Sequence, residues 1–200
     1  MLFPTLNMHP IDAWREFIVP ALTNPKWIED GSKISTEIEL SKRELLGLIL
    51  YSYYLDQTGN SNVCWNSKDH EPNDGYVDIG TNQKVRCEHK LIAQMDKRNV
   101  VVALKETFSK YAKWGKRYGE NRHLIIHANL ASLGLAKISD LHHMIKNNCP
   151  FDMVFSVGIN GIENKIIRFS FVEQFPKLRL SHIRIEILSG NLVSLDKPGK

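Results

Sequence analysis

The middle of the chain alternates short strand-like runs with helical ones, and this alternation constrains the fold more than any other feature. Apolar runs predict strands over residues 84–92, 123–128 and 151–157. Helical spacing of apolar residues predicts helices between them, over 103–118 and 138–147. A strand that is followed by a helix and then a further strand pairs in parallel through a crossover. The sequence therefore predicts an α/β protein with a mixed β-sheet flanked by helices.

A β-hairpin is predicted directly before the first of these crossovers. Two alternating runs, 76–79 and 84–92, are separated by a short turn that begins at Gly80. A three-residue turn sets Val77 opposite Val85, and the apolar side chains of the two strands then share one face. This register decides which polar residues share the other face.

Acidic and basic side chains gather on that other face. The same register sets Gly75 opposite Cys87 and Asp74 opposite Glu88, with Lys90 on the same side as Glu88. Cross-strand neighbours lie about 5 Å apart, close enough for two carboxylates to hold one cation. Asp74 and Glu88 are therefore candidate ligands for Mg²⁺ or Mn²⁺, which take oxygen ligands. We expect the face to be polar and outside the core, so that removing the Glu88 carboxylate would leave the fold intact.

Such a site has the components of phosphodiester hydrolysis. A divalent cation polarises a phosphoryl oxygen and supplies a bound hydroxide. Lys90, two residues beyond Glu88, is placed to orient the attacking water or to stabilise charge on the phosphate.

These residues resemble the pattern of the PD-(D/E)xK nuclease superfamily, which has the restriction-endonuclease-like fold. In that pattern a helix precedes an Asp at the start of one strand, then Glu-x-Lys on the next strand, then a crossover helix and a further strand. Asp74, Glu88 and Lys90 match the three positions, and the resemblance covers residues 41–157. The family's Pro–Asp pair is interrupted here, because one residue separates Pro72 from Asp74.

The resemblance implies a hydrolase: a magnesium-dependent nuclease, typically an endonuclease, with DNA a more typical substrate than RNA. Cleavage of both strands of a duplex commonly calls for two active sites, so a homodimer is compatible with it. Two alternatives stay open. The same fold can serve as a non-catalytic module that binds nucleic acid or protein, and a different hairpin register would point to another class of enzyme or an interaction protein.

Two further residues are candidates for the site. Glu44 could be an additional acid, since some members of the family carry one on the first helix, but its spacing from Ser41 is that of a capping box, which we favour. Gln94 would share the face of Lys90 on a continuing strand, where it either touches substrate or is an incidental polar residue. His89 points to the opposite face, and we interpret it as a core histidine.

A basic stripe is predicted on the helix over 103–118. Lys110, Lys113, Lys116 and Arg117 lie opposite its apolar side. Such a stripe either contacts nucleic-acid phosphates without sequence preference or is the solvated side of a surface helix.

At 200 residues the chain is expected to form one domain. Its parts are an N-terminal helical extension (1–40), the nuclease-like core (41–157) and a β-rich C-terminal part (158–200). A polar loop over 57–73 leads into Asp74.

The composition is that of a globular protein, with 42% hydrophobic and 24% charged residues. The net charge of +4 permits a nucleic-acid partner without requiring one. The most apolar window, 45–55, is too short to span a bilayer, so no membrane partner is expected. With no signal-peptide pattern and three scattered cysteines, Cys64, Cys87 and Cys149, we expect reduced thiols and a cytoplasmic protein.

Overall fold

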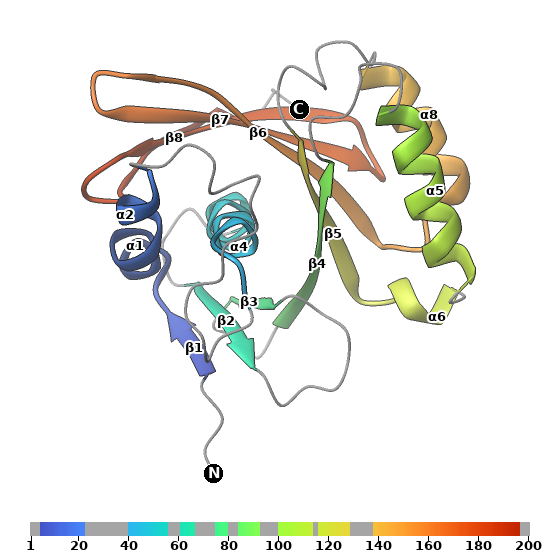
Figure 1. The fold of residues 1–200 in the computed structure, drawn as a ribbon, viewed down its shortest axis with the longest axis horizontal. Helices are drawn as coiled ribbons and strands as arrows, with labels where there is room; N and C mark the ends of the chain where they lie inside the picture. The colour runs from blue at the N-terminus through green and yellow to red at the C-terminus, as the bar shows by residue number, and fades with distance from the viewer. Residues whose placement is uncertain are drawn as a thin grey trace.

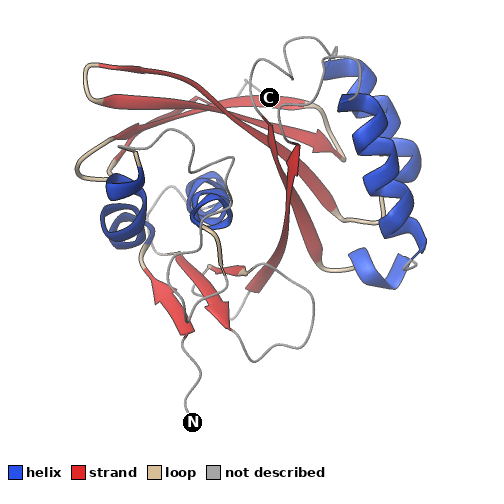
Figure 2. Ribbon diagram, viewed as in Figure 1, coloured by secondary structure: helices blue, strands red, loops and turns tan. Residues whose placement is uncertain are grey.

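A mixed sheet of nine strands runs through the described part of the chain (Figure 1, Figure 2). The structure is a computed structural model. The strands neighbour one another in chain order, from β1 at one edge to β9 at the other. The residues that the structure describes are 5–22, 40–55, 61–66, 75–79, 84–92, 100–113, 116–128 and 138–196.

The strands are β1 (Thr5–Met8), β2 (Asn62–Asn66), β3 (Tyr76–Asp78), β4 (Lys84–Ile92), β5 (Arg122–Ala128), β6 (Met153–Glu163), β7 (Ile166–Phe175), β8 (Arg179–Glu186) and β9 (Leu192–Asp196). Strand β5 lies parallel to both β4 and β6, and the other neighbouring pairs are antiparallel. The predicted mixed sheet and its two parallel pairings are confirmed.

Helices cover both faces of this sheet (Figure 1). On one side lie α1 (Pro10–Ala13), the π-helical turn η1 (Trp14–Ile18), α2 (Val19–Ala21) and α4 (Lys42–Leu55). On the other side lie α5 (Val100–Lys113), α6 (Lys116–Gly119) and α8 (Ile138–Asn148). The parallel strands in the middle are therefore covered on both faces, as parallel strands usually are.

The side chains of β5 show how the two faces divide the core. Ile125 belongs to the larger hydrophobic cluster, which α4 covers with residues such as Leu46. Leu124 and Ile126 point the other way, into a second cluster that includes Phe108 of α5. Alternation along one strand thus feeds two separate cores.

Helix α4 starts with the predicted capping box. The backbone N–H of Ser41 donates to the Glu44 carboxylate at 2.7 Å, and the backbone N–H of Glu44 donates to the Ser41 hydroxyl at 3.2 Å. Beyond the cap, Leu45, Leu46 and Ile49 are fully buried, which explains why this segment packs as a helix on the sheet. The interpretation of Glu44 as a cap is confirmed.

Helical structure in the N-terminal extension begins at Pro10, where the His9 ring accepts the backbone N–H of Ile11. Trp14 is fully buried and its indole N–H donates to the Ile187 carbonyl at 2.8 Å. Gly190 lies against the same ring with φ +72°, and a Cβ there would come within 2.7 Å of Trp14. The N-terminal helix is thereby attached to the C-terminal strands.

Two short strands were not predicted. Strand β1 lies in the extension expected to be helical, and β2 lies inside the expected loop over 57–73. Each has five residues or fewer, so alternation is too brief to be recognised and the pairing partner decides the conformation. The helix predicted over 103–118 is instead two helices, α5 and α6.

Within the described residues, no helix has the length and apolar character needed to cross a membrane. Cys64, Cys87 and Cys149 are free thiols, as expected.

The capping box leads to the first prediction. Glu44→Ala should lower the free energy of unfolding by about 1 kcal/mol, because the Ser41 N–H loses its acceptor. Urea unfolding followed by circular dichroism measures the change. Glu106→Ala, the same replacement at an exposed position of α5, is the control and should cost less than about 0.5 kcal/mol. Equal losses in the two variants would contradict the capping role.

Candidate active site

The hairpin formed by β3 and β4 has the predicted register. Val77 pairs with Val85, and the N–H of Cys87 donates to the Gly75 carbonyl at 2.9 Å. Asp74 and Gln94 lie outside the described residues. The expected opposition of Asp74 to Glu88 therefore remains a prediction, one residue beyond the pairing seen here.

Glu88 is buried, which corrects the expectation that its face is polar and outside the core. Its residue is 6% exposed, and its Oε1 lies 3.2 Å from Nη1 of Arg122, itself 8% exposed. The hydroxyl of Tyr118 donates to the same oxygen at 3.0 Å. Glu88 points toward β5 and α6, and these elements cover it.

Tyr118 and Arg122 form a compact unit around this carboxylate. The Arg122 guanidinium lies 4.5 Å from the centroid of the Tyr118 ring, within cation–π range. The ring also stacks on Tyr111 of α5. Burial and the neighbouring Glu88 raise the pKa of the Tyr118 hydroxyl, so it remains protonated and able to donate. The carboxylate is thus held in one orientation by a cation and a neutral donor.

Lys90 is half-buried and lies on the same face of β4 as Glu88, since the two are separated by one residue. It pairs with Ile126 of the parallel strand β5. The predicted Glu-x-Lys arrangement on one strand, next to a parallel strand reached through a helix, is therefore present. Nearer the hairpin turn, Lys84 pairs with Asp78.

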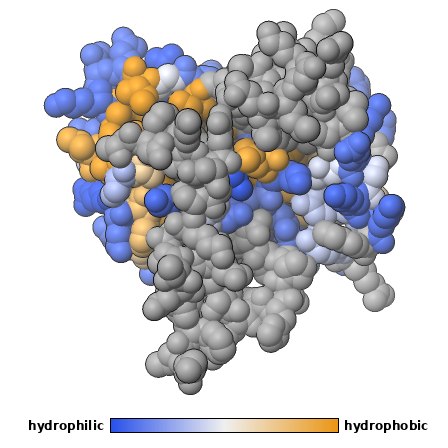
Figure 3. All heavy atoms as spheres, in the orientation of Figure 1, coloured by the Kyte–Doolittle hydropathy of each residue, from blue (hydrophilic) through white to orange (hydrophobic). Residues whose placement is uncertain are grey.

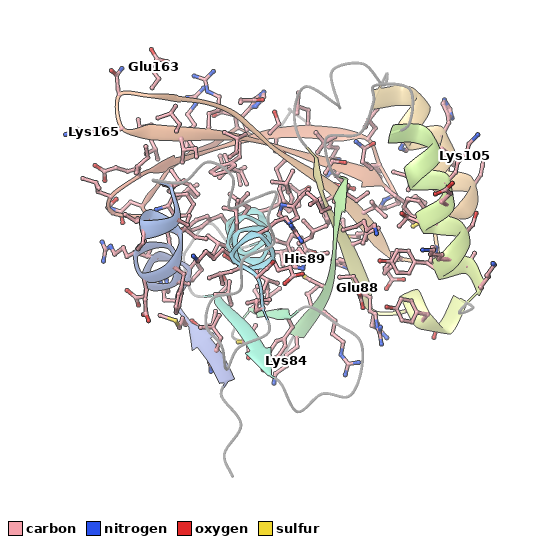
Figure 4. All side chains as sticks on the ribbon, in the orientation of Figure 1. Lys84, Glu88, His89, Lys105, Glu163 and Lys165 are labelled. Carbon is pink, nitrogen blue, oxygen red and sulfur yellow. The ribbon has the colours of Figure 1, made fainter. Side chains whose placement is uncertain are left out.

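His89 points to the opposite face of β4, toward α4 (Figure 4). A Cβ on Gly47 of α4 would lie 2.6 Å from its Nε2 and 2.8 Å from Nε2 of His127, so only glycine allows the helix to approach. The two imidazole rings are 5.5 Å apart. Because α4 packs on this face, Glu44 belongs to the side of the sheet away from Glu88. The interpretation of His89 as a core histidine is confirmed.

Three histidines on the α4 side are held neutral. Burial, together with nearby Arg43, lowers the pKa of His89 to about 3. Burial and the neighbouring His89 lower the pKa of His127 well below its ordinary value. Burial lowers the pKa of His123, whose Nδ1 contacts the Tyr51 hydroxyl, to about 4.

The basic stripe is described only in part. Lys110 and Lys113 are exposed on α5, whose outer surface is mostly hydrophilic in Figure 3. Lys116 and Arg117 belong to α6, but their side chains are not among those described. Both exposed lysines fit a solvated helix face as well as a phosphate-binding one.

Sequence reasoning missed Arg122 and Tyr118. Arg122 stands one residue before the predicted strand over 123–128, and Tyr118 ends the predicted helix. An arginine at the start of the strand next to Glu88 was a usable signal, since a buried carboxylate requires a counter-ion.

Comparisons with protein-family models, with curated proteins and with solved structures give no match. Among the residues that the structure describes, no three His, Cys, Asp or Glu side chains are grouped as metal ligands would be.

The buried histidines predict loss of stability in acid. Their pKa values are lower in the folded than in the unfolded protein, so below about pH 6.5 the unfolded chain binds more protons. Stability should therefore be complete near pH 7 and fall between pH 6.5 and about 4, by up to about 1.4 kcal/mol per pH unit for each histidine. Urea unfolding at a series of pH values measures this fall, and NMR of the histidine ring protons identifies the groups. Equal stability at pH 7 and pH 5 would refute the assignment.

The ion pair between Glu88 and Arg122 predicts that a single replacement lowers the free energy of unfolding much more than replacement of both residues does. Arg122→Leu should destabilise the protein by about 3–5 kcal/mol, because it leaves a buried charge without its counter-ion. Replacing both residues with Leu should recover most of that loss.

Urea unfolding of the three proteins measures the asymmetry. Arg168→Leu makes the same change at an exposed position of β7 and should be nearly neutral. If the double variant is no more stable than Arg122→Leu, the loss in the single variant does not come from the unpaired charge of Glu88.

Proposed function

We propose that this protein is a metal-dependent nuclease of the restriction-endonuclease-like class that hydrolyses phosphodiester bonds in nucleic acid. DNA is the favoured substrate over RNA. The observation that carries the proposal is the arrangement of the hairpin and its first crossover. Helix α4, strand β3, strand β4 with Glu88 and Lys90, helix α5 and parallel strand β5 occur in the order of the family's pattern, with β2 inserted before β3 and α6 before β5.

The residues fit a hard cation by the chemistry of their donors. Glu88 presents a carboxylate whose Oε1 is already oriented by Arg122 and Tyr118. In the proposal Asp74, next along the register from Gly75, is the second ligand. Bound Mg²⁺ or Mn²⁺ would supply Lewis-acid polarisation of the phosphoryl oxygen.

The other residues act through their own chemistry. Lys90, on the face of Glu88, orients a water molecule or stabilises negative charge on the phosphate. Arg122 supplies the counter-charge of the Glu88 carboxylate at 3.2 Å. Tyr118 fixes the direction of the carboxylate by donating to it.

A second function is favoured by the ion pair itself. Arg122 already neutralises Glu88, which gives the carboxylate a sufficient structural role. In that case the fold is a non-catalytic module that binds nucleic acid or protein, and Glu88 binds no metal.

The decisive experiment is cleavage of supercoiled plasmid, single-stranded DNA and RNA with Mg²⁺ or Mn²⁺, and with EDTA. Glu88→Gln is the appropriate variant, because an amide keeps the size of the side chain and an acceptor for Tyr118 while removing the charge. We expect it and Asp74→Asn to lose at least about 10²-fold in rate. Lys90→Met should lose about 10²–10³-fold while still binding metal.

Glu106→Gln removes an exposed carboxylate of α5 and should cleave like the wild type. Circular dichroism shows whether each variant is folded. Cleavage by Glu88→Gln at the wild-type rate would refute the site, and a wild type that cleaves none of the substrates would favour the binding module.

A further inference from the structure

The outer surface of α5 and α8 carries an excess of positive charge. Its exposed lysines are Lys105, Lys110 and Lys113 of α5 and Lys146 of α8. The acidic side chain that the structure describes on these two helices is Glu106. Within the described part of the chain, none of the four lysines forms an ion pair. Their charge is therefore available to a partner in solution.

The two helices present this charge to the same side of the molecule. Helices α5 and α8 contact one another, and Phe108 of α5 and Met144 of α8 enter one hydrophobic cluster against the sheet. Their exposed residues consequently face away from the sheet, as Figure 4 shows for Lys105. Lys105 and Lys113 are eight positions apart, so the amino groups of α5 spread over about 12 Å of helix.

The neighbours of these lysines disfavour a lipid membrane as the partner. A helix that binds a membrane surface inserts large apolar side chains beside its cations. The large apolar side chains that are exposed in the described chain lie on β6, β8, β9 and the turns beside β8, and none lies on α5 or α8. Between its charged residues α5 exposes Ser109 and Ala112. The surface attracts anions by charge alone.

The same neighbours favour a duplex over a single strand of nucleic acid. Single-stranded sites combine cations with aromatic rings on which bases stack. The described exposed side chains of α5 and α8 include no Phe, Tyr or Trp. Tyr111 of α5 packs inward against Phe151. Cations without a stacking ring suit a duplex, whose bases are paired and whose phosphates line the outside.

This surface adjoins the candidate active site. Helix α6 follows α5 closely in the chain, contacts it, and carries Tyr118, whose hydroxyl donates to Glu88. The Tyr118 ring also stacks on Tyr111 of α5. A polyanion on α5 and α8 would therefore lie beside the element that covers Glu88.

We infer that α5 and α8 form a docking surface for duplex nucleic acid, bound through its phosphates and without sequence preference. The inference rests on the proposed function for its choice of polyanion, and it adds the surface and the form of nucleic acid that this surface takes. Lys110 and Lys113 alone would also fit a solvated helix face. The addition of Lys105 and of Lys146 from a second helix, all without ion pairs, favours a binding surface.

The test measures binding in EDTA, so that it does not depend on metal or cleavage. Fluorescence anisotropy with a labelled DNA duplex gives Kd at several salt concentrations. The double variant Lys110→Gln, Lys113→Gln should bind several-fold more weakly. Its slope of log K against log salt should be smaller by about 1.8, because two phosphate contacts are lost at about 0.9 each. Glutamine removes the charge and has a similar helix propensity to lysine.

A second double variant, Lys105→Gln with Lys146→Gln, tests whether the surface extends onto α8, and its slope should fall by a similar amount. Lys165→Gln with Lys177→Gln is the matched control, since it removes the same charge from exposed positions outside α5 and α8. The control should keep the wild-type slope. Each single variant should show about half the effect of its double variant, which tests the surface even if a double variant fails to fold.

Two further probes test the choice of partner. A labelled single strand of the same length and a labelled polyglutamate should both bind the wild type more weakly than the duplex does. Tighter binding of the single strand would overturn the duplex, and tighter binding of polyglutamate would assign the surface to an acidic protein.

The outcomes separate this inference from the nuclease proposal. Smaller slopes in both helix variants, with the wild-type slope in the control, support the inference even if the wild type cleaves nothing. Equal slopes in all variants overturn it, and assign the lysines to a solvated surface, even if the wild type cleaves and Glu88→Gln does not. A wild type that binds no duplex also overturns it.

Discussion

The parallel pairing of β4 with β5 is the contact on which the rest of the molecule depends. It joins the antiparallel strands β1 to β4 to the rest of the sheet. Its register runs from Arg86 opposite Arg122 to Ile92 opposite Ala128. Each strand sends side chains into both cores, so α4 packs on one side of the pair and the helices after β4 pack on the other. A strand in this position can carry a polar group only where a helix or a neighbouring strand supplies its partner.

Glu88 is the polar group that this arrangement accommodates. Its ion pair with Arg122 and its hydrogen bond from Tyr118 attach β4 to β5 and α6 at once. The same contacts that stabilise the carboxylate also fix the direction of its Oε1. Structure and proposed chemistry therefore depend on one side chain, and any substitution that tests function must preserve its packing. This is why an amide, and not alanine, is the informative replacement.

The sequence predicted structure correctly where apolar residues repeat over a long segment, or where a local motif has a known physical basis. The capping box at Ser41 and the hairpin register through Val77 and Val85 both follow from local rules, and both are present. The two parallel pairings of β5 followed from the alternation of strands and helices along the chain. The failures were short strands such as β2, whose conformation is decided by its pairing with β1 and β3.

The burial of Glu88 was missed for a related physical reason. Alternation on a hairpin separates two faces but does not say which elements will later cover them. The polar face of β4 is covered by α6 and by Arg122, which come 28 residues or more after Glu88 in the chain. Whether the polar face of a hairpin is buried therefore depends on elements that follow it in the chain, and the sequence of the hairpin alone does not predict it.

The central claim is that Glu88, although paired with Arg122, is a metal ligand in a hydrolytic site. A crystal structure of the wild type soaked in Mn²⁺, with anomalous diffraction recorded near the manganese edge, tests it most directly. The account predicts an anomalous peak in contact with carboxylate oxygens of both Glu88 and Asp74, and no such peak in Glu88→Gln. A saturating soak that leaves Glu88 bound to Arg122 with no manganese at its carboxylate would contradict the account.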